Sequence, residues 1–265
     1  MTITQAIVLG LVQGITEFLP ISSSGFLILV PEVLGWDLQS QAFDAFLHVA
    51  TLLAIVAALW SEVVAIGKAL LIPSEDSESR MWRAVATWVL LATLPVLGVG
   101  YLVSEFLGIE FRSVEVVAWS FIVWGTVLYV VDRSVKQSKD DIRNIGFNKA
   151  LLIGLSQAIA IIPGTSRSGI TMTAGLAAGL SRVTAAKFSF LLSIPTIAAA
   201  GFFKLGQVAS GKETVELFPL AVGFFVAMIS AFLTAKFLLA FVKNHTFSEF
   251  AIFRILVGVA ILLLL

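Results

Sequence analysis

Long hydrophobic stretches alternate with short polar links along this chain. A bilayer core about 30 Å thick requires roughly 20 apolar residues for each helical crossing. The links contain turn formers and charges, as in IPSEDSESR at 72–80 and RSVKQSKDDIRN at 133–144. The pattern therefore predicts six membrane-spanning helices. They cover about 45–66, 84–104, 114–131, 184–204, 217–242 and 247–265.

Two further apolar regions, 5–34 and 148–180, are interrupted in the middle. The first is broken by ITEFLPISSSG and the second by IAIIPGTSRSG, so that each break combines a proline, a glycine and a serine cluster. Irregular backbone at membrane depth persists only where it is buried in protein or lines a wet cavity. We therefore expect each region to form a re-entrant helix–loop–helix hairpin that enters and leaves the membrane on the same face.

The two interrupted regions match each other at an offset of 144 residues. Chance explains a match between apolar residues, but it does not explain a shared glutamine, Ser-x-Ser-Gly and a second glycine in register. We therefore interpret the chain as a duplication. The matched residues of the first copy are Gly10, Leu11, Gln13, Ile15, Ser22, Ser24, Gly25, Gly35, Phe46 and Leu47.

Each copy contains one hairpin and three spans. Because a hairpin returns to its own face and three spans cross the membrane an odd number of times, the second copy has the inverted orientation. The sequence thus predicts an all-α polytopic membrane protein with an inverted-topology repeat. We expect a single integral membrane domain over 1–265, with repeat one at about 1–140 and repeat two at about 145–265. Such repeats place a ligand site near the midplane, where broken helices meet.

Composition supports the membrane assignment and excludes several functions. Hydrophobic residues make up 58% of the 265 residues and charged residues 13%, against about a quarter charged in soluble proteins. The absence of cysteine excludes disulfides, thiolate zinc sites and cysteine nucleophiles. A net charge of zero without a basic domain argues against a nucleic-acid partner. The first residues lack the features of a cleaved secretory signal, so we expect Met1 to remain on the mature chain.

Basic residues in the links predict the orientation, because cytoplasmic loops carry an excess of Lys and Arg. The face that carries Met1 holds Arg112, Lys204 and Lys212. The opposite face holds Lys68, Arg80, Arg83, Arg133, Lys136, Lys139, Arg143, Lys149, Arg182 and Lys243. This asymmetry predicts a multi-pass protein of the cell membrane with both termini extracytoplasmic and the first hairpin open to the outside.

The first interruption carries a carboxylate among hydroxyls. Gln13 and Glu17 are four residues apart and share a helix face, and Thr16 and the serines 22–24 lie close by. A carboxylate at this depth is costly unless a cation or metal accompanies it. The alternative is a helix-end role for Glu17 near the interface.

The second interruption carries an arginine between serines. Ser166, Arg167, Ser168 and Thr171 precede or open a helical stretch. Backbone amides at a helix start, hydroxyls and a guanidinium together form an anion site, and arginine suits phosphate. The alternative is a structural ion pair between Arg167 and Glu17, and the two interpretations are compatible.

The two sets are complementary for phosphoryl transfer, which relies on positioning and charge neutralisation. A carboxylate with hydroxyl oxygens suits a divalent cation, Mg²⁺ or Ca²⁺. Other polar residues are weaker candidates. His48 follows Asp44 by one helical turn, Lys187 lies near a span end, Lys236 and Arg254 are expected to snorkel or pair, and His245 is expected to be inert.

Two long motifs carry a resemblance to a known family. GLVQGITEFLPISSSG and IPGTSRSGIT resemble the motifs of undecaprenyl-diphosphate phosphatases of the BacA type, and the resemblance covers essentially the whole chain. It implies hydrolysis of a C55 polyprenyl diphosphate to the monophosphate on the outer side of the membrane. It also implies recycling of the carrier lipid of peptidoglycan synthesis, bacitracin resistance and dependence on a divalent cation.

The resemblance also assigns roles to residues. Glu17 would be the metal or base carboxylate, Ser23 a candidate nucleophile and Arg167 the diphosphate clamp. The same pocket would be lined by Gln13, Ser22, Ser24, Ser166, Ser168 and Thr171. Many family members have a histidine after the serine-rich glycine, with an acid–base or nucleophile role, whereas this chain has Phe26. That role is then dispensable, or His48 or a water molecule supplies it.

The sequence also raises two alternatives to hydrolysis of a polyprenyl diphosphate by this family's chemistry. Inverted repeats and a midplane site are also typical of a transporter or flippase for polyprenyl phosphate lipids. A lipid phosphatase of the soluble type needs two motif histidines, which Phe26 and the residues after Arg167 do not provide. A homodimer is compatible with the sequence.

Overall fold

The computed structural model describes residues 1–264 apart from 73, 104–112, 136–137, 139 and 210–215, and without the side chains of 203–209. All regular secondary structure in this described part is helical. Of the basic residues used above for orientation, Arg112, Lys136, Lys139, Lys212 and the side chain of Lys204 lie outside the described residues. The helices are α1 Ile3–Thr16, α2 Ser23–Leu34, α3 Gln41–Ala58, α4 Trp60–Leu71, α5 Ser77–Leu102, α6 Val114–Ser134, α7 Phe147–Gln157, α8 Arg167–Ala177, α9 Arg182–Ala209, α10 Leu217–Phe241 and α11 Ser248–Leu264, with short 3₁₀ turns η2 Ile142–Asn144 and η3 Ala158–Ile161.

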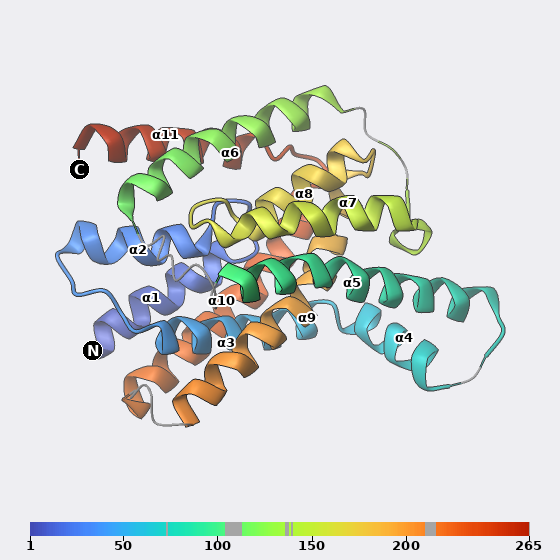
Figure 1. The fold of residues 1–265 in the computed structure, drawn as a ribbon, viewed down its shortest axis with the longest axis horizontal. Coiled ribbons are helices and arrows are strands. Elements are labelled where there is room, and N and C mark those ends of the chain that lie inside the picture. Colours follow the sequence, from blue (N-terminus) through green and yellow to red (C-terminus); the bar gives the residue numbers. More distant parts are fainter. Residues whose placement is uncertain (73, 104–112, 136–137, 139, 210–215, 265) are drawn as a thin grey trace.

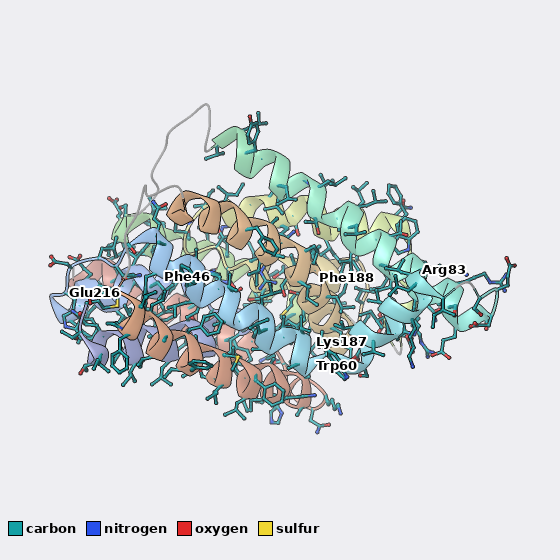
Figure 2. All side chains as sticks on the ribbon, turned by 90° about the horizontal axis from the view of Figure 1, so that it is seen from below. Phe46, Trp60, Arg83, Lys187, Phe188 and Glu216 are labelled. Carbon is teal, nitrogen blue, oxygen red and sulfur yellow. The ribbon has the colours of Figure 1, made fainter. Side chains whose placement is uncertain are left out.

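The helices run roughly along the long axis of the molecule, and the two chain ends lie at the same end of it (Figure 1). Charged side chains occur at both ends, with Glu216 at one and Arg83 at the other, whereas Phe46 and Phe188 lie between them (Figure 2). Within the described residues, five helices are long and apolar enough to cross a membrane: α3, α5, α6, α9 and α10. The chain is thus a multi-pass membrane protein.

Two predicted spans differ from the structure. The span expected at 45–66 ends at Ala58, because Leu59 leaves the helical conformation with φ −107° and ψ 31°, and α4 starts anew at Trp60. Lys236 Nζ of α10 donates a 2.8 Å hydrogen bond to the carbonyl oxygen of Ala58. A charged donor from another helix therefore stabilises the break between α3 and α4. No proline or glycine at this position predicts the break from the sequence. The stretch expected at 247–265 forms α11, which at 17 residues is the shortest of the six.

Both interrupted regions break where the sequence predicts. The first forms α1 and α2, with the break between Thr16 and Ser23, and the second forms α7, η3 and α8, with the break between Ile161 and Arg167. The chain turns back after α1, so that α2 returns toward the end where the N-terminus lies (Figure 1). The loops between these helices meet in the interior of the protein.

Small residues let the broken helices approach their neighbours closely. A Cβ atom on Gly14 of α1 would lie 2.6 Å from the carbonyl oxygen of Ala227 in α10. A Cβ atom on Gly154 of α7 would lie 2.5 Å from the carbonyl oxygen of Ala92 in α5. Close backbone approach between small residues is a principal way in which helices associate in membranes. These contacts hold α1 against α10 and α7 against α5, and so fix the position of each loop.

Candidate active site

The two loops end in the same unusual way. Ser22 and Ser166 are the N-caps of α2 and α8, with φ values of +79° and +70°. Each serine Oγ accepts a hydrogen bond from the amide three residues on, at 3.4 Å from Gly25 and at 3.0 Å from Gly169. The helices α2 and α8 therefore each begin directly after a serine that has a positive φ and serves as the N-cap. Backbone amides in the first turn of a helix are available to bind an anion.

Glu17 lies between the two loops and is 6% exposed. Its Oε1 accepts a 2.7 Å hydrogen bond from Nη2 of Arg167, which comes 150 residues later in the chain. Its Oε2 accepts hydrogen bonds from Ser23 Oγ at 2.6 Å and from Gln13 Nε2 at 3.0 Å. The expected ion pair between the interruptions is thus present, and one carboxylate oxygen contacts the hydroxyl that opens α2.

His48 of α3 completes this cluster. Its Nε2 lies 3.5 Å from Glu17 Oε2, and its Nδ1 lies 2.7 Å from the carbonyl oxygen of Asp44. A carbonyl oxygen only accepts hydrogen bonds, so Nδ1 carries a proton and donates it there. Nε2 is then the ring atom that exchanges a proton with its surroundings, and it faces the carboxylate of Glu17. His48 can therefore take part in acid–base chemistry.

A hollow of about 240 Å³ is lined by most of the predicted catalytic and substrate-binding residues. Its lining includes Glu17, Ser22, Ser23, Ser24, His48, Ser166 and Arg167. Thr196 and an apolar wall that contains Val96 and Ile197 come from α9 and α5 and were not predicted. No motif marks these three residues in the sequence, since they are ordinary residues of hydrophobic spans. The lining of the hollow combines polar groups with apolar side chains, as an amphipathic lipid requires.

Three predicted binding residues lie behind this lining. Gln13 is fully buried and contacts Glu17. Ser168 Oγ donates a 2.9 Å hydrogen bond to the carbonyl oxygen of Leu19, which joins α8 to the first loop. Thr171 Oγ1 donates at 2.8 Å to the carbonyl oxygen of Arg167, within the first turn of α8. In this structure the three side chains orient the groups that line the hollow, and direct contact with a ligand stays a prediction for them.

Phe26 points into an aromatic cluster. Its ring centroid lies 5.4 Å from that of Phe121 and 6.0 Å from that of Phe253. Phe26 is not among the described residues that line the hollow. A side chain at this position packs on α6 and α11 in the present arrangement, whereas His48 lies beside the carboxylate. The geometry therefore favours His48 for the acid–base role.

The donor set around Glu17 fits a divalent cation that is shared with a phosphate ligand. Gln13 Oε1 is buried without a hydrogen-bond partner, and the serine hydroxyls supply further hard oxygens. Mg²⁺ commonly binds through one or two carboxylates plus substrate phosphates, and it keeps several waters. Across the described part of the chain, no group of three or more His, Cys, Asp or Glu side chains is placed to hold a metal ion. The carboxylate of Glu17 and the amide oxygen of Gln13 could together hold a cation whose other ligands come mostly from the phosphate and water.

The weaker polar candidates lie elsewhere. Lys187 Nζ lies 2.6 Å from Glu62 Oε1, in an ion pair between α9 and α4. His245 stacks on Phe241, with ring centroids 4.2 Å apart. Arg254 is 0% exposed, so of the two alternatives expected for it, snorkelling is wrong, and its guanidinium is instead hydrogen-bonded inside the protein. Its partners are backbone carbonyls of the loops, which no local pattern around an intramembrane arginine could indicate.

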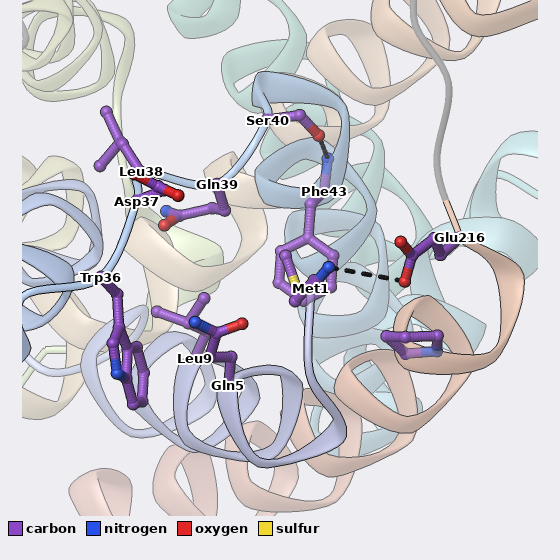
Figure 3. A pocket seen from close by; sticks show the side chains of 11 residues that line it. Met1, Gln5, Leu9, Trp36, Asp37, Leu38, Gln39, Ser40, Phe43 and Glu216 are labelled. Atoms are coloured by element: carbon purple, nitrogen blue, oxygen red, sulfur yellow. Dashed lines mark hydrogen bonds and ion pairs between the residues drawn. The ribbon is translucent and has the colours of Figure 1, made fainter.

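A second hollow, of about 290 Å³, lies at the end of the molecule where the chain starts (Figure 3). The N-terminal ammonium of Met1 lies 3.5 Å from Glu216 Oε2 at its rim. Trp36 and Asp37 line it as well. It contains none of the predicted site residues, so the hollow at Glu17 is the candidate active site.

Comparison with known proteins identifies the family of the chain. Residues 6–260 match the family described as bacitracin resistance protein BacA. The chain is 43% identical over 265 residues to an undecaprenyl-diphosphatase of Pelotomaculum thermopropionicum, covering 100% of this chain and 97% of the relative. It is 40% identical to undecaprenyl-diphosphatase 1 of Pseudoalteromonas translucida over 100% and 99% of the two chains, and 40% identical to an undecaprenyl-diphosphatase of Colwellia psychrerythraea over 99% and 98%. Because the match includes both interrupted regions and nearly the whole chain, this protein belongs to the BacA family.

Proposed function

We propose that this protein hydrolyses undecaprenyl diphosphate to undecaprenyl monophosphate and inorganic phosphate on the extracytoplasmic side of the membrane. The reaction recycles the carrier lipid of peptidoglycan synthesis and confers bacitracin resistance. The observation that carries the proposal is the meeting of Glu17, Ser23, His48 and Arg167 at one hollow with an apolar wall. Relatives that cover the whole chain are named undecaprenyl-diphosphatase.

The diphosphate binds between the two loops. Arg167 Nη2 and the free amides at the starts of α2 and α8 are donors suited to phosphate oxygens. Arg167 Nη2 is paired with Glu17 Oε1, and an incoming phosphate takes over part of this pairing. The prenyl chain leaves the hollow along its apolar side, which includes Val96 and Ile197.

Ser23 and Glu17 carry the first chemical step. Ser23 Oγ attacks the terminal phosphorus while its proton passes to Glu17 Oε2, 2.6 Å away. The bond between that phosphorus and the bridging oxygen breaks, and undecaprenyl monophosphate leaves with the bonding electron pair. The terminal phosphoryl group is then held on Ser23 as a phosphoserine.

His48 and water carry the second step. Glu17 passes its proton to His48 Nε2, 3.5 Å away, and becomes a carboxylate again. It then accepts a proton from a water molecule whose oxygen attacks the phosphoserine phosphorus. The P–Oγ bond breaks, Ser23 regains a proton from Glu17, and His48 releases its proton to solvent. Water and diphosphate are consumed, and monophosphate, phosphate and one proton are formed.

A divalent cation, Mg²⁺ or Ca²⁺, neutralises charge on the phosphate oxygens when it is bound. Glu17 and Gln13 Oε1 are the residues that would hold it, together with the diphosphate itself.

For the arrangement in the membrane, we propose an inverted repeat with two re-entrant hairpins and both termini extracytoplasmic. The matched conformations of Ser22 and Ser166 support a common origin of the two loops. The N- and C-termini lie at one end of the molecule, and α2 runs back to that end after the turn that follows α1 (Figure 1). Arg83 lies at the other end (Figure 2), in agreement with the excess of basic residues expected in cytoplasmic loops.

A second function, transfer of polyprenyl phosphate across the membrane, is favoured by the place of the hollow between two related halves. A carrier of this kind moves lipid phosphate across liposomes without hydrolysis. Phosphate release and lipid movement are measured separately, so the two functions are distinguishable in one preparation.

The test of the proposed function is phosphate release from undecaprenyl or farnesyl diphosphate by purified protein in detergent with Mg²⁺ or Ca²⁺. We expect Glu17→Gln, Ser23→Ala and Arg167→Ala each to reduce kcat/KM at least about a hundredfold, in the range typical of acid–base and electrostatic groups. Glu62→Gln is the matched control, because Glu62 is a paired carboxylate outside the hollow. No phosphate release with either cation, or a wild-type rate in Glu17→Gln, would contradict the proposal.

The same preparation tests the nucleophile. With substrate labelled at the terminal phosphorus, rapid denaturation during turnover should retain label on the wild-type chain and none on Ser23→Ala. Label that remains in Ser23→Ala would assign the attack to another hydroxyl. No label on the wild type, at full activity, would assign it to water.

A further inference from the structure

Arg254 is among the largest fully buried side chains of the described residues, although it carries a charge. It lies in the middle of α11, and its guanidinium reaches under both loops. Nη2 donates to the carbonyl oxygens of Gly164 at 2.7 Å and Thr165 at 2.9 Å, and Nη1 donates to that of Pro20 at 3.3 Å. One side chain thus holds three carbonyls from two loops that are more than a hundred residues apart in sequence.

The carbonyls that Arg254 holds lie next to the residues that form the site. Pro20 precedes Ser22 by two residues, and Thr165 directly precedes Ser166, so the held carbonyls belong to the turns that end in the two positive-φ serines. The first turn of α8 is also close, since a Cβ atom on Gly169 would lie 3.1 Å from Arg254 Nη1. Movement of this guanidinium would therefore move both loops relative to each other.

The charge of Arg254 has no acidic partner among the described residues. The ion pairs found there do not include it. Its further contacts include the carbonyl oxygen of Ser120 at 3.4 Å and the ring of Phe121, whose centroid lies 5.6 Å from the guanidinium carbon. Placing a charge at this depth is costly, and intramembrane charges usually mark function. Apolar residues of similar volume often replace buried charges without loss of stability. Packing alone therefore gives no reason for an arginine at this position. The guanidinium group, in contrast, carries several N–H donors in a fixed plane and can bond carbonyl oxygens of both loops at once.

We propose that Arg254 is a positioning residue for the hydrolysis, which sets the register between the loop of Glu17 and Ser23 and the loop of Arg167. The expected effect of Arg254 on the rate of hydrolysis rests on the proposed function. The expected effect of Arg254 on the positions of the two loops rests on the geometry alone. Arg254 does not reach the hollow itself, whose described lining does not include it. It acts through Pro20, Gly164 and Thr165, by keeping the attacking hydroxyl in line with a phosphate held on the other loop. Misplacement of a reacting group by about 1 Å costs on the order of a hundredfold in rate.

The decisive variant is Arg254→Lys, which keeps the charge and loses the fork. We expect kcat for phosphate release to fall at least about tenfold while KM changes less than about threefold, because Arg167 and the α8 amides still bind the diphosphate. Arg254→Gln should lose at least as much kcat. Lys236→Gln is the matched control: Lys236 is another intramembrane cation that donates to a carbonyl, that of Ala58 at 2.8 Å, away from both loops, and its kcat should stay within about twofold of the wild type.

Amide hydrogen exchange provides the readout that a merely structural role would not move. In folded Arg254→Lys, exchange should become faster at 17–25 and 162–169 and stay unchanged in α5 and α10. Wild-type kcat in Arg254→Lys, or a general loss of folding with exchange accelerated in all helices, would overturn the proposal. If the wild type itself releases no phosphate, the proposed function fails, and the exchange experiment still decides whether Arg254 holds the loops.

Discussion

Ser22 and Ser166 lie 144 positions apart and share a backbone conformation that L-residues rarely adopt, with φ of +79° and +70°. Both serines cap a helix through the amide three residues later. In each loop the hydroxyl cap offsets the backbone strain. This pair relates the two halves of the site more directly than any match of apolar residues.

The first prediction concerns this strain. Ser166→Ala should destabilise the protein by about 0.5–2 kcal/mol, because it loses the hydroxyl cap and keeps the same strained conformation. Ser166→Gly should cost only a few tenths of a kcal/mol, since glycine adopts positive φ freely. Thermal unfolding in detergent measures both. Equal midpoints for the alanine and glycine variants would show that the conformation is not strained.

The second prediction concerns the buried pair of Glu17 and Arg167, whose side chains are 5% and 14% exposed. Arg167→Met should destabilise by about 3–5 kcal/mol, because it leaves a buried carboxylate without its cation. The double variant Glu17→Gln with Arg167→Met should be more stable than Arg167→Met alone, although it is inactive. A double-mutant cycle measures the coupling, and strict additivity of the two changes would argue against a direct pair.

The third prediction concerns the histidine that many family members have where this chain has Phe26. His48→Gln should lower kcat by about 10²–10⁴-fold, the range of a general acid–base group. Phe26→His should not restore activity to His48→Gln, because position 26 packs on Phe121 and Phe253. Rates are compared in wild type, both single variants and the double variant. Recovery in the double variant would return the acid–base role to position 26.

The fourth prediction concerns Asp132, which is 1% exposed in α6. Its Oδ1 accepts a 2.6 Å hydrogen bond from Arg182 Nε, and its Oδ2 accepts from the amides of Phe247 and Ser248, both at 3.0 Å. Asp132→Asn removes the buried carboxylate charge that accepts these hydrogen bonds and should cost about 3–5 kcal/mol, while kcat of the folded protein stays near wild type. A large loss of kcat at unchanged stability would instead connect this cluster to catalysis.

The fifth prediction concerns the loop pair of Asp141 and Arg143, which lies outside the spans. Hydrogen bonds from Arg143 lower the pKa of Asp141 to about 2, from an ordinary value of about 3.9. A lowered pKa means that the pair stabilises the fold above about pH 4 and that this contribution disappears as the pH falls through about 2. The side chain of Asp141 is 41% exposed, so the contribution is about 0.2–1 kcal/mol.

Asp141→Asn should accordingly unfold slightly earlier than wild type at pH 5–7, and the difference should shrink toward pH 2. Thermal midpoints of both proteins across this pH range give the comparison. A difference that grows as the pH falls would contradict the sign of the lowered pKa.

Hydrophobic patterning predicts the helices and their breaks well, because both depend on local composition. Segments of sufficient apolar length appear as helices, and both breaks fall at the predicted proline, glycine and serine clusters. The exception is the span that ends at Ala58, where the carbonyl at the break is satisfied by Lys236 from a helix far along the chain. Periodicity within a segment carries no information about such a partner.

The sequence by itself determined that this is a membrane protein with two matched loops, one acidic and one basic, and its motifs pointed to the residues around Glu17 and Arg167. Only the tertiary structure decided which side chains line the hollow, that Phe26 packs on aromatic rings while His48 lies beside Glu17, and that Arg254 holds both loops. The physical reason is the range of the interactions. Burial and helix breaks follow from neighbours in the chain, whereas the position of a guanidinium under two distant carbonyl-rich turns depends on how α1, α7 and α11 pack.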